Sequence, residues 1–349
     1  MNNDKKNKRF GSLALILGLS LFYMGLQVSN AQTIRHGPVG VMDLVNMDMP
    51  PAVLAADPGW TNPNVKGYLI RMSWKTVEPS KGVYNFATFD QACLLAAAHG
   101  KTVGLSIGAG TMTPAWVYTA GAKQFSITIA DGSTEIMPLP WDPVFQSNWS
   151  TMISALGQRY AFNPVVNYVT MAGIGRDFES SVTETASDTA NFNTLGGQTL
   201  WVPAAVKIAK FFTTSFPNTH IVCAMGSPIP DPGNTGTGHT MMDTVVNDML
   251  AACPHQFGVA CDSLTGVTPA QTPAVTYIEA QYKNTSCGFQ MFLPSPKVTG
   301  STLAQGLALG VEFKAHYVEV YSYDCALSTQ QSALVSANTG LAANSGFHP

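Results

Sequence analysis

The chain has 349 residues, a formal net charge of −3 and only 11% charged residues. This length allows one large domain or two small ones. The sequence shows no basic face of the kind that nucleic-acid-binding proteins use, so we expect no nucleic-acid partner.

The N-terminus has the three parts of a signal peptide. A basic segment (residues 5–9) precedes an apolar run (residues 10–26), and Ser29 and Ala31 place small residues before Gln32. This pattern predicts a signal peptide over residues 1–31 with cleavage after Ala31. The alternative is an uncleaved anchor helix, although the apolar run is near the lower length limit for spanning a bilayer. We therefore expect a secreted or periplasmic protein that does not associate with the membrane after cleavage.

Strand-like and helix-like segments alternate through residues 32–349. The predicted strands are 39–45, 68–73, 102–107, 166–172, 220–225, 257–261, 275–281 and 317–323. The predicted helices are 86–99, 147–161, 200–216, 240–253 and 302–314. Eight parallel strands joined by helices are the number that closes a (β/α)8 TIM barrel, so we predict a single α/β barrel domain. An open doubly wound sheet is the alternative, but no dinucleotide-binding glycine motif follows a first strand.

A long connection follows the third predicted strand, over residues 108–146. Within it, two alternating runs flank Asp131 and Gly132. Asp-Gly between alternating runs predicts a β-hairpin. Long loops at the C-terminal face of barrel strands shape the substrate site, so we expect this hairpin near it.

Six cysteines remain after the predicted cleavage. An even number in an exported chain permits disulfides. Cys287 and Cys325 follow the predicted seventh and eighth strands, which are neighbours in a barrel, so we predict that they are bridged. Cys93 and Cys223 lie in apolar runs and are expected to be buried thiols. Neither cysteine nor histidine spacing indicates a metal site.

One motif is specific enough to suggest a family. Residues 74–90 have the pattern W-x-x-x-E-P-x-x-G-x-Y-x-F-x-x-x-D, between two apolar runs separated by a helix. This stretch resembles the second strand and loop of barrel glycoside hydrolases of the β-galactosidase and cellulase clan. The resemblance implies a TIM barrel that cleaves β-linked oligo- or polysaccharides without a cofactor.

The same resemblance implies two catalytic carboxyls. The clan places its acid/base Glu after strand four and its nucleophile on strand seven, which here correspond to Glu179 and Glu279. Glycoside hydrolysis needs one carboxyl to protonate the leaving oxygen and another to attack the anomeric carbon. We expect the two carboxyls to face each other across the barrel mouth at about 5–5.5 Å, the separation of retaining enzymes.

Several alternatives remain open at these positions. Asp177 could replace Glu179 as the acid, or both could belong to a solvated ion cluster with Arg176. If the strand count is off by one, Glu319 on the last strand becomes the nucleophile. A barrel that binds glycan without cleaving it is the alternative function, because the sequence after strand four departs from the Asn-Glu that is usual in the clan.

Other residues are candidates for substrate binding. Arg71 lies on the second predicted strand, where the resemblance implies an arginine that contacts the nucleophile; a structural salt bridge is the alternative. Aromatic side chains near the mouth could stack on sugar rings, although each could also be ordinary packing. These candidates are Trp74, Trp116, Trp141, Tyr282 and Tyr321.

Overall fold

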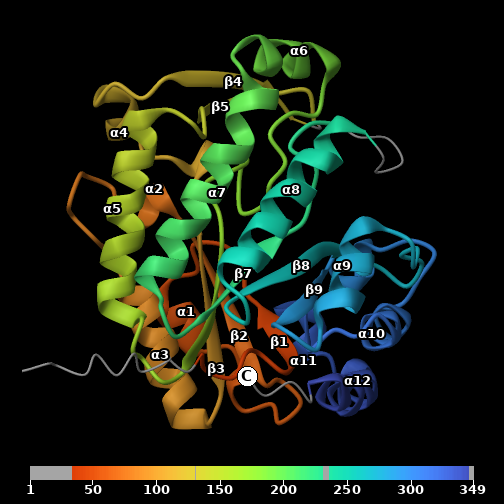
Figure 1. Ribbon diagram of the computed structural model, residues 1–349. Helices are drawn as coiled ribbons and strands as arrows, with labels where there is room; N and C mark the ends of the chain where they lie inside the picture. The colour runs from red at the N-terminus through yellow and green to blue at the C-terminus, as the bar shows by residue number, and fades with distance from the viewer. Residues whose placement is uncertain (1–33, 130, 231–235, 346–349) are drawn as a thin grey trace, which may run out of the picture. The chain divides into compact units, whose positions relative to one another are not determined.

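Eight parallel strands close into a barrel, in the order in which they follow one another along the chain (Figure 1). The computed structural model describes residues 34–129, 131–230 and 236–345. The barrel strands are β1 (Gly40–Leu44), β2 (Gly67–Ser73), β3 (Thr102–Gly108), β6 (Val166–Thr170), β7 (His220–Ala224), β8 (Phe257–Leu264), β9 (Cys287–Met291) and β10 (Tyr317–Tyr321). β10 pairs with β1, which confirms the predicted (β/α)8 barrel and excludes the open sheet. The predicted signal peptide, residues 1–31, lies outside the described residues.

One strand assignment was wrong. Residues 275–281 belong to a helix, α9 (Pro273–Gln281), and the seventh barrel strand is β9. Thr272 and Pro273 form a typical helix start, and the buried residues Ala274, Val275 and Ile278 fall on one helical face. The β-branched and aromatic residues of this stretch favoured a strand, but the proline start and helical spacing decide its structure.

Helices cover the outside of the barrel. The longer ones are α3 (Ala87–His99), α5 (Pro143–Tyr160), α7 (Gly197–Ser215), α8 (Thr237–Ala252), α9, α10 (Leu303–Glu312) and α12 (Gln331–Asn344). A further helix, α6 (Ala186–Thr194), packs against α7 and the hairpin that follows β3. Short helical segments in the loops are α1 (Pro51–Ala55), α2 (Trp74–Val77), α4 (Ala115–Thr119) and α11 (Ser322–Ala326), with 3₁₀ turns η1 (Pro58–Trp60), η2 (Gly110–Met112), η4 (Ser295–Lys297) and η5 (Ser328–Gln330). Asp142 caps α5 by accepting hydrogen bonds from two backbone N–H groups, and Thr302 forms a capping box at the start of α10. Within the described ranges, no helix is both long and apolar enough to cross a membrane.

Two tyrosines fill the middle of the barrel. Tyr168 of β6 and Tyr317 of β10 are fully buried, and their ring centroids are 5.3 Å apart. Each ring occupies space left by a glycine on an adjacent strand. A Cβ atom on Gly104 would lie 2.1 Å from the Tyr168 ring, and one on Gly288 would lie 2.3 Å from the Tyr317 ring. The pair forms a floor beneath the C-terminal end of the barrel.

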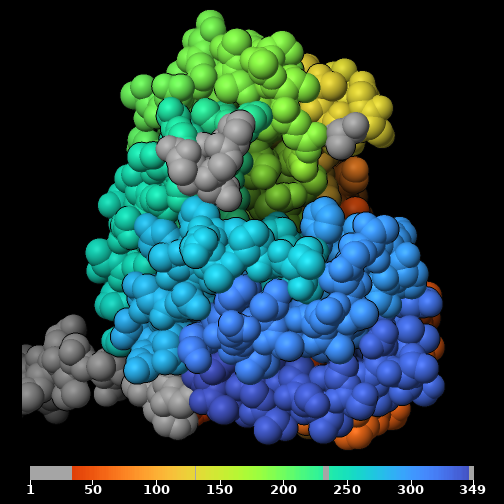
Figure 2. All heavy atoms as spheres, turned by 90° about the vertical axis from the view of Figure 1, so that its right-hand side faces the viewer, coloured from red at the N-terminus to blue at the C-terminus, as the bar shows by residue number. Residues whose placement is uncertain are grey.

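The predicted hairpin is confirmed as β4 (Gln124–Thr128) and β5 (Thr134–Pro138), which pair antiparallel. Gly132 in its turn has φ +83°, a conformation that glycine adopts without strain. The hairpin lies next to α6 at the top of Figure 1, and the Thr128 backbone N–H donates to the Asp188 carboxylate at 2.8 Å. Figure 2 shows the hairpin in yellow and the green segment that carries α6 above the blue C-terminal elements.

The predicted disulfide is also wrong. All six cysteines are free thiols. Cys287 is the first residue of β9, whereas Cys325 lies in α11, beyond the C-terminal end of β10. The two residues therefore lie toward opposite ends of the barrel, and a five-residue strand rising about 3.3 Å per residue keeps them well beyond bridging distance. Cys93 and Cys223 are buried, as expected.

Candidate active site

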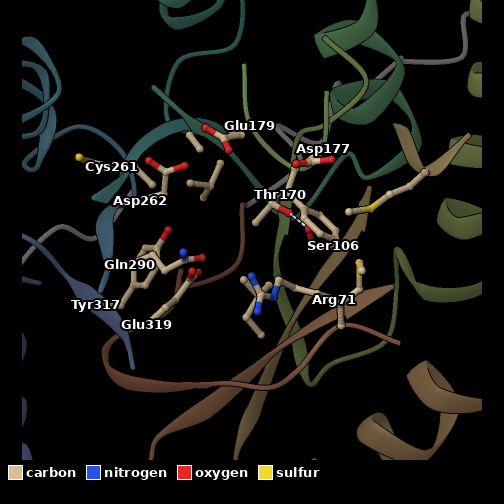
Figure 3. Close-up of a pocket in the computed structure, with 17 residues that line it drawn as sticks. Arg71, Ser106, Thr170, Asp177, Glu179, Cys261, Asp262, Gln290, Tyr317 and Glu319 are labelled. Atoms are coloured by element: carbon tan, nitrogen blue, oxygen red, sulfur yellow. Dashed lines mark hydrogen bonds between the residues drawn. The ribbon is translucent and has the colours of Figure 1, made fainter. Parts of the chain in front are cut away.

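A cavity of about 310 Å³ opens at the C-terminal end of the barrel, above the tyrosine floor. In a (β/α)8 barrel this is the end where functional side chains gather. Its polar lining consists of Arg71, Ser106, Thr170, Asp177, Glu179, Asp262, Gln290, Tyr317 and Glu319 (Figure 3). Most of these residues lie near the C-terminal ends of different strands, so closure of the barrel is what brings them together.

Glu319 on β10 lies deep in this cavity, with a residue exposure of only 5%. Its Oε1 accepts a hydrogen bond from the Tyr168 hydroxyl at 2.9 Å. Burial raises the pKa of Glu319 to about 7; the Tyr168 hydrogen bond and the charge of Arg71 oppose that rise, and Asp262 adds to it. Figure 3 shows the Arg71 guanidinium pointing toward Glu319 across the cavity.

Arg71 is held in place by the backbone of the loop after β1. Its Nε and Nη2 donate to the Val45 carbonyl at 3.4 and 3.3 Å, and its guanidinium lies 5.8 Å from the ring centroid of Phe178. Burial lowers the pKa of this arginine, while the negative charge of Glu319 acts in the opposite direction. The cation therefore faces the cavity without a direct ion pair at 4 Å or less among the described residues.

Asp262 and Glu179 are neighbouring carboxyls at the wall of the cavity. Asp262 lies near the end of β8, and Glu179 lies in the loop after β6. Burial, and secondarily the nearby carboxylate of Glu179, raise the pKa of Asp262 to about 7, while the charge of Arg176 opposes this rise. A carboxyl beside a like charge holds its proton more tightly, so the Glu179 carboxylate favours the protonated form of Asp262.

The loop after β6 follows a path that only glycines allow. Gly173 has φ +94° and packs against Trp149, where a Cβ atom would lie 2.3 Å from the indole nitrogen. Gly110 approaches the loop from η2, and a Cβ on it would lie 2.0 Å from the Arg176 carbonyl oxygen. These close approaches place residues 176–179 over the barrel mouth.

Arg176 in this loop binds the neighbouring carboxylates. Its guanidinium lies 3.8 Å from both Asp177 and Glu179, and it also pairs with Glu184. The Thr111 hydroxyl donates to Asp177 at 2.8 Å. The ion cluster considered from the sequence is therefore present, and two of its members, Asp177 and Glu179, also line the cavity.

Glu279 does not share this cavity. It lies on the exposed face of α9, because the segment predicted as strand seven is a helix. The prediction that the Glu179 and Glu279 carboxyls face each other across the barrel mouth depended on a strand at residues 275–281. Because that segment is a helix, the prediction no longer has support. The actual seventh strand presents Gln290, an amide, next to Glu319 in the β9–β10 pairing.

The aromatic residues proposed to bind sugar are mostly packing residues. Trp74 is fully buried, and both its indole and that of Trp116 donate to Glu78, at 2.7 and 3.0 Å. Trp141 packs against Phe192 with ring centroids 5.3 Å apart. Burial of the Trp74 indole removes the surface on which a sugar ring would stack, whereas Trp116 and Trp141 are half-buried and lie outside the cavity lining.

The two tyrosines proposed as binding residues do not line the cavity either. Tyr282 is the C-cap of α9. Tyr321 ends β10 and donates its hydroxyl to the Phe292 carbonyl at 3.2 Å. Of the residues predicted to bind substrate, Arg71 is the one that the structure brings to the cavity.

Sequence reasoning missed Asp262, Gln290 and Tyr317. Asp262 lies one residue beyond the strand predicted over 257–261, so a small error at a strand end removed it from consideration. Gln290 would have emerged from the alternation of inward and outward side chains once β9 was located. Tyr317 precedes Glu319 by two residues on the last strand, so the same alternation places both on one face of a strand that was predicted. In the described part of the chain, no group of three or more His, Cys, Asp or Glu side chains is arranged to hold a metal ion.

Comparison with known proteins agrees with the resemblance to barrel glycoside hydrolases. A family model described as β-galactosidase matches residues 67–190, the segment from the start of β2 into α6. The resemblance to barrel glycosidases is confirmed. A search of curated protein sequences gives no match.

Two solved structures share the fold. The catalytic domain of β-amylase from Paenibacillus polymyxa superposes with a TM-score of 0.56 at 10% identity, covering 90% of this chain and 99% of that one. The cold-adapted β-galactosidase from Rahnella sp. R3 superposes with a TM-score of 0.53 at 11% identity, covering 89% of this chain and 57% of that one. At these identities the likeness concerns the fold alone.

Proposed function

We propose that this protein is an exported glycoside hydrolase that cleaves β-linked oligo- or polysaccharides with carboxyl groups of the barrel cavity. The observation that carries the proposal is the pairing of two carboxyls with raised pKa values, Glu319 and Asp262, in one cavity that also holds Arg71. Glycoside hydrolysis requires a protonated and an ionised carboxyl at the same site. The match to the β-galactosidase family model supports this class of reaction.

The surroundings of the two carboxyls favour opposite roles. Glu319 accepts a hydrogen bond from Tyr168 and faces a guanidinium, both of which stabilise its carboxylate form. Asp262 lies beside a second carboxylate, Glu179, which stabilises its protonated form. Burial raises the pKa of both carboxyls to about 7, so their roles are assigned from these local partners, with Glu319 as the nucleophile and Asp262 as the acid.

The proposed reaction follows from these roles. The Glu319 carboxylate attacks the anomeric carbon as the glycosidic C–O bond breaks, and Asp262 gives its proton to the leaving oxygen, with Glu179 at its side. Water then hydrolyses the glycosyl ester, and Asp262 takes back a proton. Retention of configuration is part of this proposal, with Glu319 in place of the strand-seven Glu of the resembled clan.

The assay is a screen of aryl β-glycosides, β-glucans and other β-linked oligosaccharides, followed by substitution at the best substrate. General acid–base and nucleophilic groups contribute about 10²–10⁴-fold each, so Glu319→Gln and Asp262→Asn should each lower kcat/KM by a factor in that range. Glu279→Ala is the matched carboxyl control on exposed α9 and should retain full activity. Azide should restore cleavage of an activated glycoside by Glu319→Ala; rescue of Glu279→Ala instead would return the nucleophile to α9.

A second function is favoured by one observation, the amide of Gln290 on the seventh strand. A barrel without a strand-seven carboxylate could bind glycan without cleaving it. Calorimetric binding of an oligosaccharide by the native protein, with no product released over long incubation, would support this function over hydrolysis.

Export is proposed from the N-terminal pattern alone. Expression of the full sequence in a host with a secretion pathway should yield a mature chain that begins at Gln32. Mass spectrometry of the exported protein measures this, and a cell-retained chain of full length would contradict it.

A further inference from the structure

We propose that the substrate is an extended, uncharged oligosaccharide that lies across the barrel mouth and is cut at an internal bond. This inference rests on the proposed function and adds to it the shape of the substrate and the position of the cut. It comes from the way in which the catalytic cavity joins two other cavities.

A second cavity, of about 230 Å³, adjoins the first at the acid pair. Glu179, Cys261 and Asp262 line both cavities. Beyond them, the second cavity is bounded by Gly226, after β7, and by Thr272, at the start of α9. The proposed proton donor therefore stands at a junction between two spaces and not at the end of one.

A third cavity, of about 780 Å³, adjoins the first on another side. Met47, Met112 and Asp177 line both of them. The third cavity extends to the β4–β5 hairpin, which contributes Thr134 and Ile136. The hairpin follows β3, so this cavity reaches the β2–β3 side of the mouth.

The barrel order separates the two outer cavities. Going around the barrel, β6 lies between β3 and β7, and β8 follows β7. The loop after β6 borders both outer cavities. Apart from that loop, the second cavity is bounded by segments that follow β7 and β8, and the third by segments that follow β1, β2 and β3. A chain of sugar units bound in both therefore crosses the catalytic cavity and extends beyond the carboxyls in both directions. Cleavage between them leaves sugar units on each side of the broken bond.

The lining indicates what kind of sugar chain fits. Met47, Met112 and Ile136 offer apolar surface for the C–H faces of sugar rings, and Thr134 offers a hydroxyl. The connected cavities hold carboxylates in excess of cations, with Glu135 and Glu184 added to the catalytic group on the third-cavity side. Lys75 and Arg176 also line the third cavity, but carboxylates outnumber them. Because like charges across an interface oppose binding, polyuronates are disfavoured and uncharged chains are favoured.

Length dependence tests the inference independently of hydrolysis. Calorimetric titration of the Glu319→Gln protein with β-linked oligosaccharides of two to six units should show affinity that rises with each unit up to at least four. The same titration with an oligogalacturonide should give no binding. Affinity that is complete at the disaccharide would overturn the inference, whether or not the native protein cleaves anything.

Product analysis tests the position of the cut. Hexasaccharides labelled at the reducing end should give labelled products of two to four units at early times, and a hexasaccharide capped at its non-reducing end should be cleaved. Release of terminal units alone, with the capped substrate intact, would overturn the inference and leave the proposed function standing. Failure to cleave any substrate, with length-dependent binding retained, would remove the proposed function and the internal cut together.

Substitutions that fill the second or third cavity test whether each of these cavities binds sugar units. Ser263→Trp adds bulk to the second cavity and Thr134→Trp to the third, and both side chains are exposed at present. Each should lower kcat/KM for the hexasaccharide about tenfold relative to an aryl monosaccharide, the loss of roughly one sugar contact. Ser336→Trp, on the exposed face of α12, is the matched control and should leave that ratio unchanged. Equal ratios in all three variants would contradict the extended binding mode.

Discussion

Glu319 is a buried carboxyl whose neighbours keep it available for chemistry. A glutamate on a barrel strand is costly to bury without partners. Here the partners are the Tyr168 hydroxyl at 2.9 Å and the charge of Arg71, and the side chain still reaches the cavity. Although Glu319 is only 5% exposed, it lines the cavity, where a ligand can contact it.

Loss of the Tyr168 hydroxyl should move the pH profile in a defined direction. The hydrogen bond lowers the pKa of Glu319, so Tyr168→Phe should raise that pKa above its present value of about 7. Because the proposed reaction uses the carboxylate, the acid limb of kcat/KM should shift to higher pH, with a greater loss at pH 6 than at pH 8.

The matched control for this experiment is Tyr160→Phe. Tyr160 also donates to a carboxylate, Asp90, at 2.8 Å, but on the outside of the barrel. The Tyr160→Phe protein should be less stable than the native protein, but the pH profile of its kcat/KM should not shift. Identical profiles for the native protein and Tyr168→Phe would remove Glu319 from the role of base.

Tyr317 should behave differently from Tyr168 although both line the barrel floor. Its hydroxyl is buried, borders the cavity and has no hydrogen-bond partner among the described residues. An unpaired buried hydroxyl costs about 1–3 kcal/mol. Tyr317→Phe should therefore leave the free energy of unfolding unchanged or higher, yet lower kcat/KM if the hydroxyl binds a sugar hydroxyl in the complex. Urea unfolding and steady-state kinetics measure the two effects, and a less stable protein with native kinetics would refute this role.

At the scale of elements, the pattern of the sequence predicts most of the barrel. Seven of the eight strand predictions fall on the strands of the structure, because short apolar runs between helical segments are distinctive. The seventh failed because Val275, Thr276, Tyr277 and Ile278 are typical strand residues whose spacing is also helical. Pro273 was the signal that could have decided between the two structures.

The glycines of β3 and β9 show how elements fit around the floor. Gly288→Ala would place a Cβ 2.3 Å from the Tyr317 ring, and both atoms belong to strands that cannot easily separate. Overpacking of this kind costs about 1–3 kcal/mol of unfolding free energy. Chemical denaturation should show that loss, and Tyr317→Leu in the same chain should recover part of it. Full stability of Gly288→Ala would mean that β9 shifts without cost.

At the scale of the whole molecule, the site depends on closure of the barrel, which no local sequence pattern reveals. The alternation of strands and helices predicts a barrel, but not which side chains meet at its mouth. Arg71, Glu179, Asp262 and Glu319 come from segments that are far apart in sequence and that only the barrel order places around one cavity. The burial of Trp74 is likewise a property of packing between loops, which composition does not specify.

Burial of carboxyls in this barrel should also make its stability depend on pH. Asp43 on β1 is fully buried, accepts a hydrogen bond from Ser322 and has one oxygen with no partner. Burial, and secondarily Asp57, raise its pKa to about 8, while Asp262 and Glu319 have pKa values of about 7. In the unfolded chain these groups titrate near pH 4.

Between about pH 4 and pH 8 the folded protein therefore binds more protons than the unfolded chain, and stability must fall as pH rises. Each unit of pKa difference corresponds to about 1.4 kcal/mol, so the loss from pH 5 to pH 8.5 should amount to several kcal/mol. Asp43→Asn keeps an acceptor for Ser322 but cannot ionise, so the unfolding free energy of this variant should fall less steeply across the same interval. Because Asp43 lies outside the cavity lining, its replacement should change this slope without changing the pH profile of catalysis. Urea titrations at pH 5 and pH 8.5 measure the slope, and equal slopes for the two proteins would show that Asp43 is already ionised in the folded barrel at neutral pH.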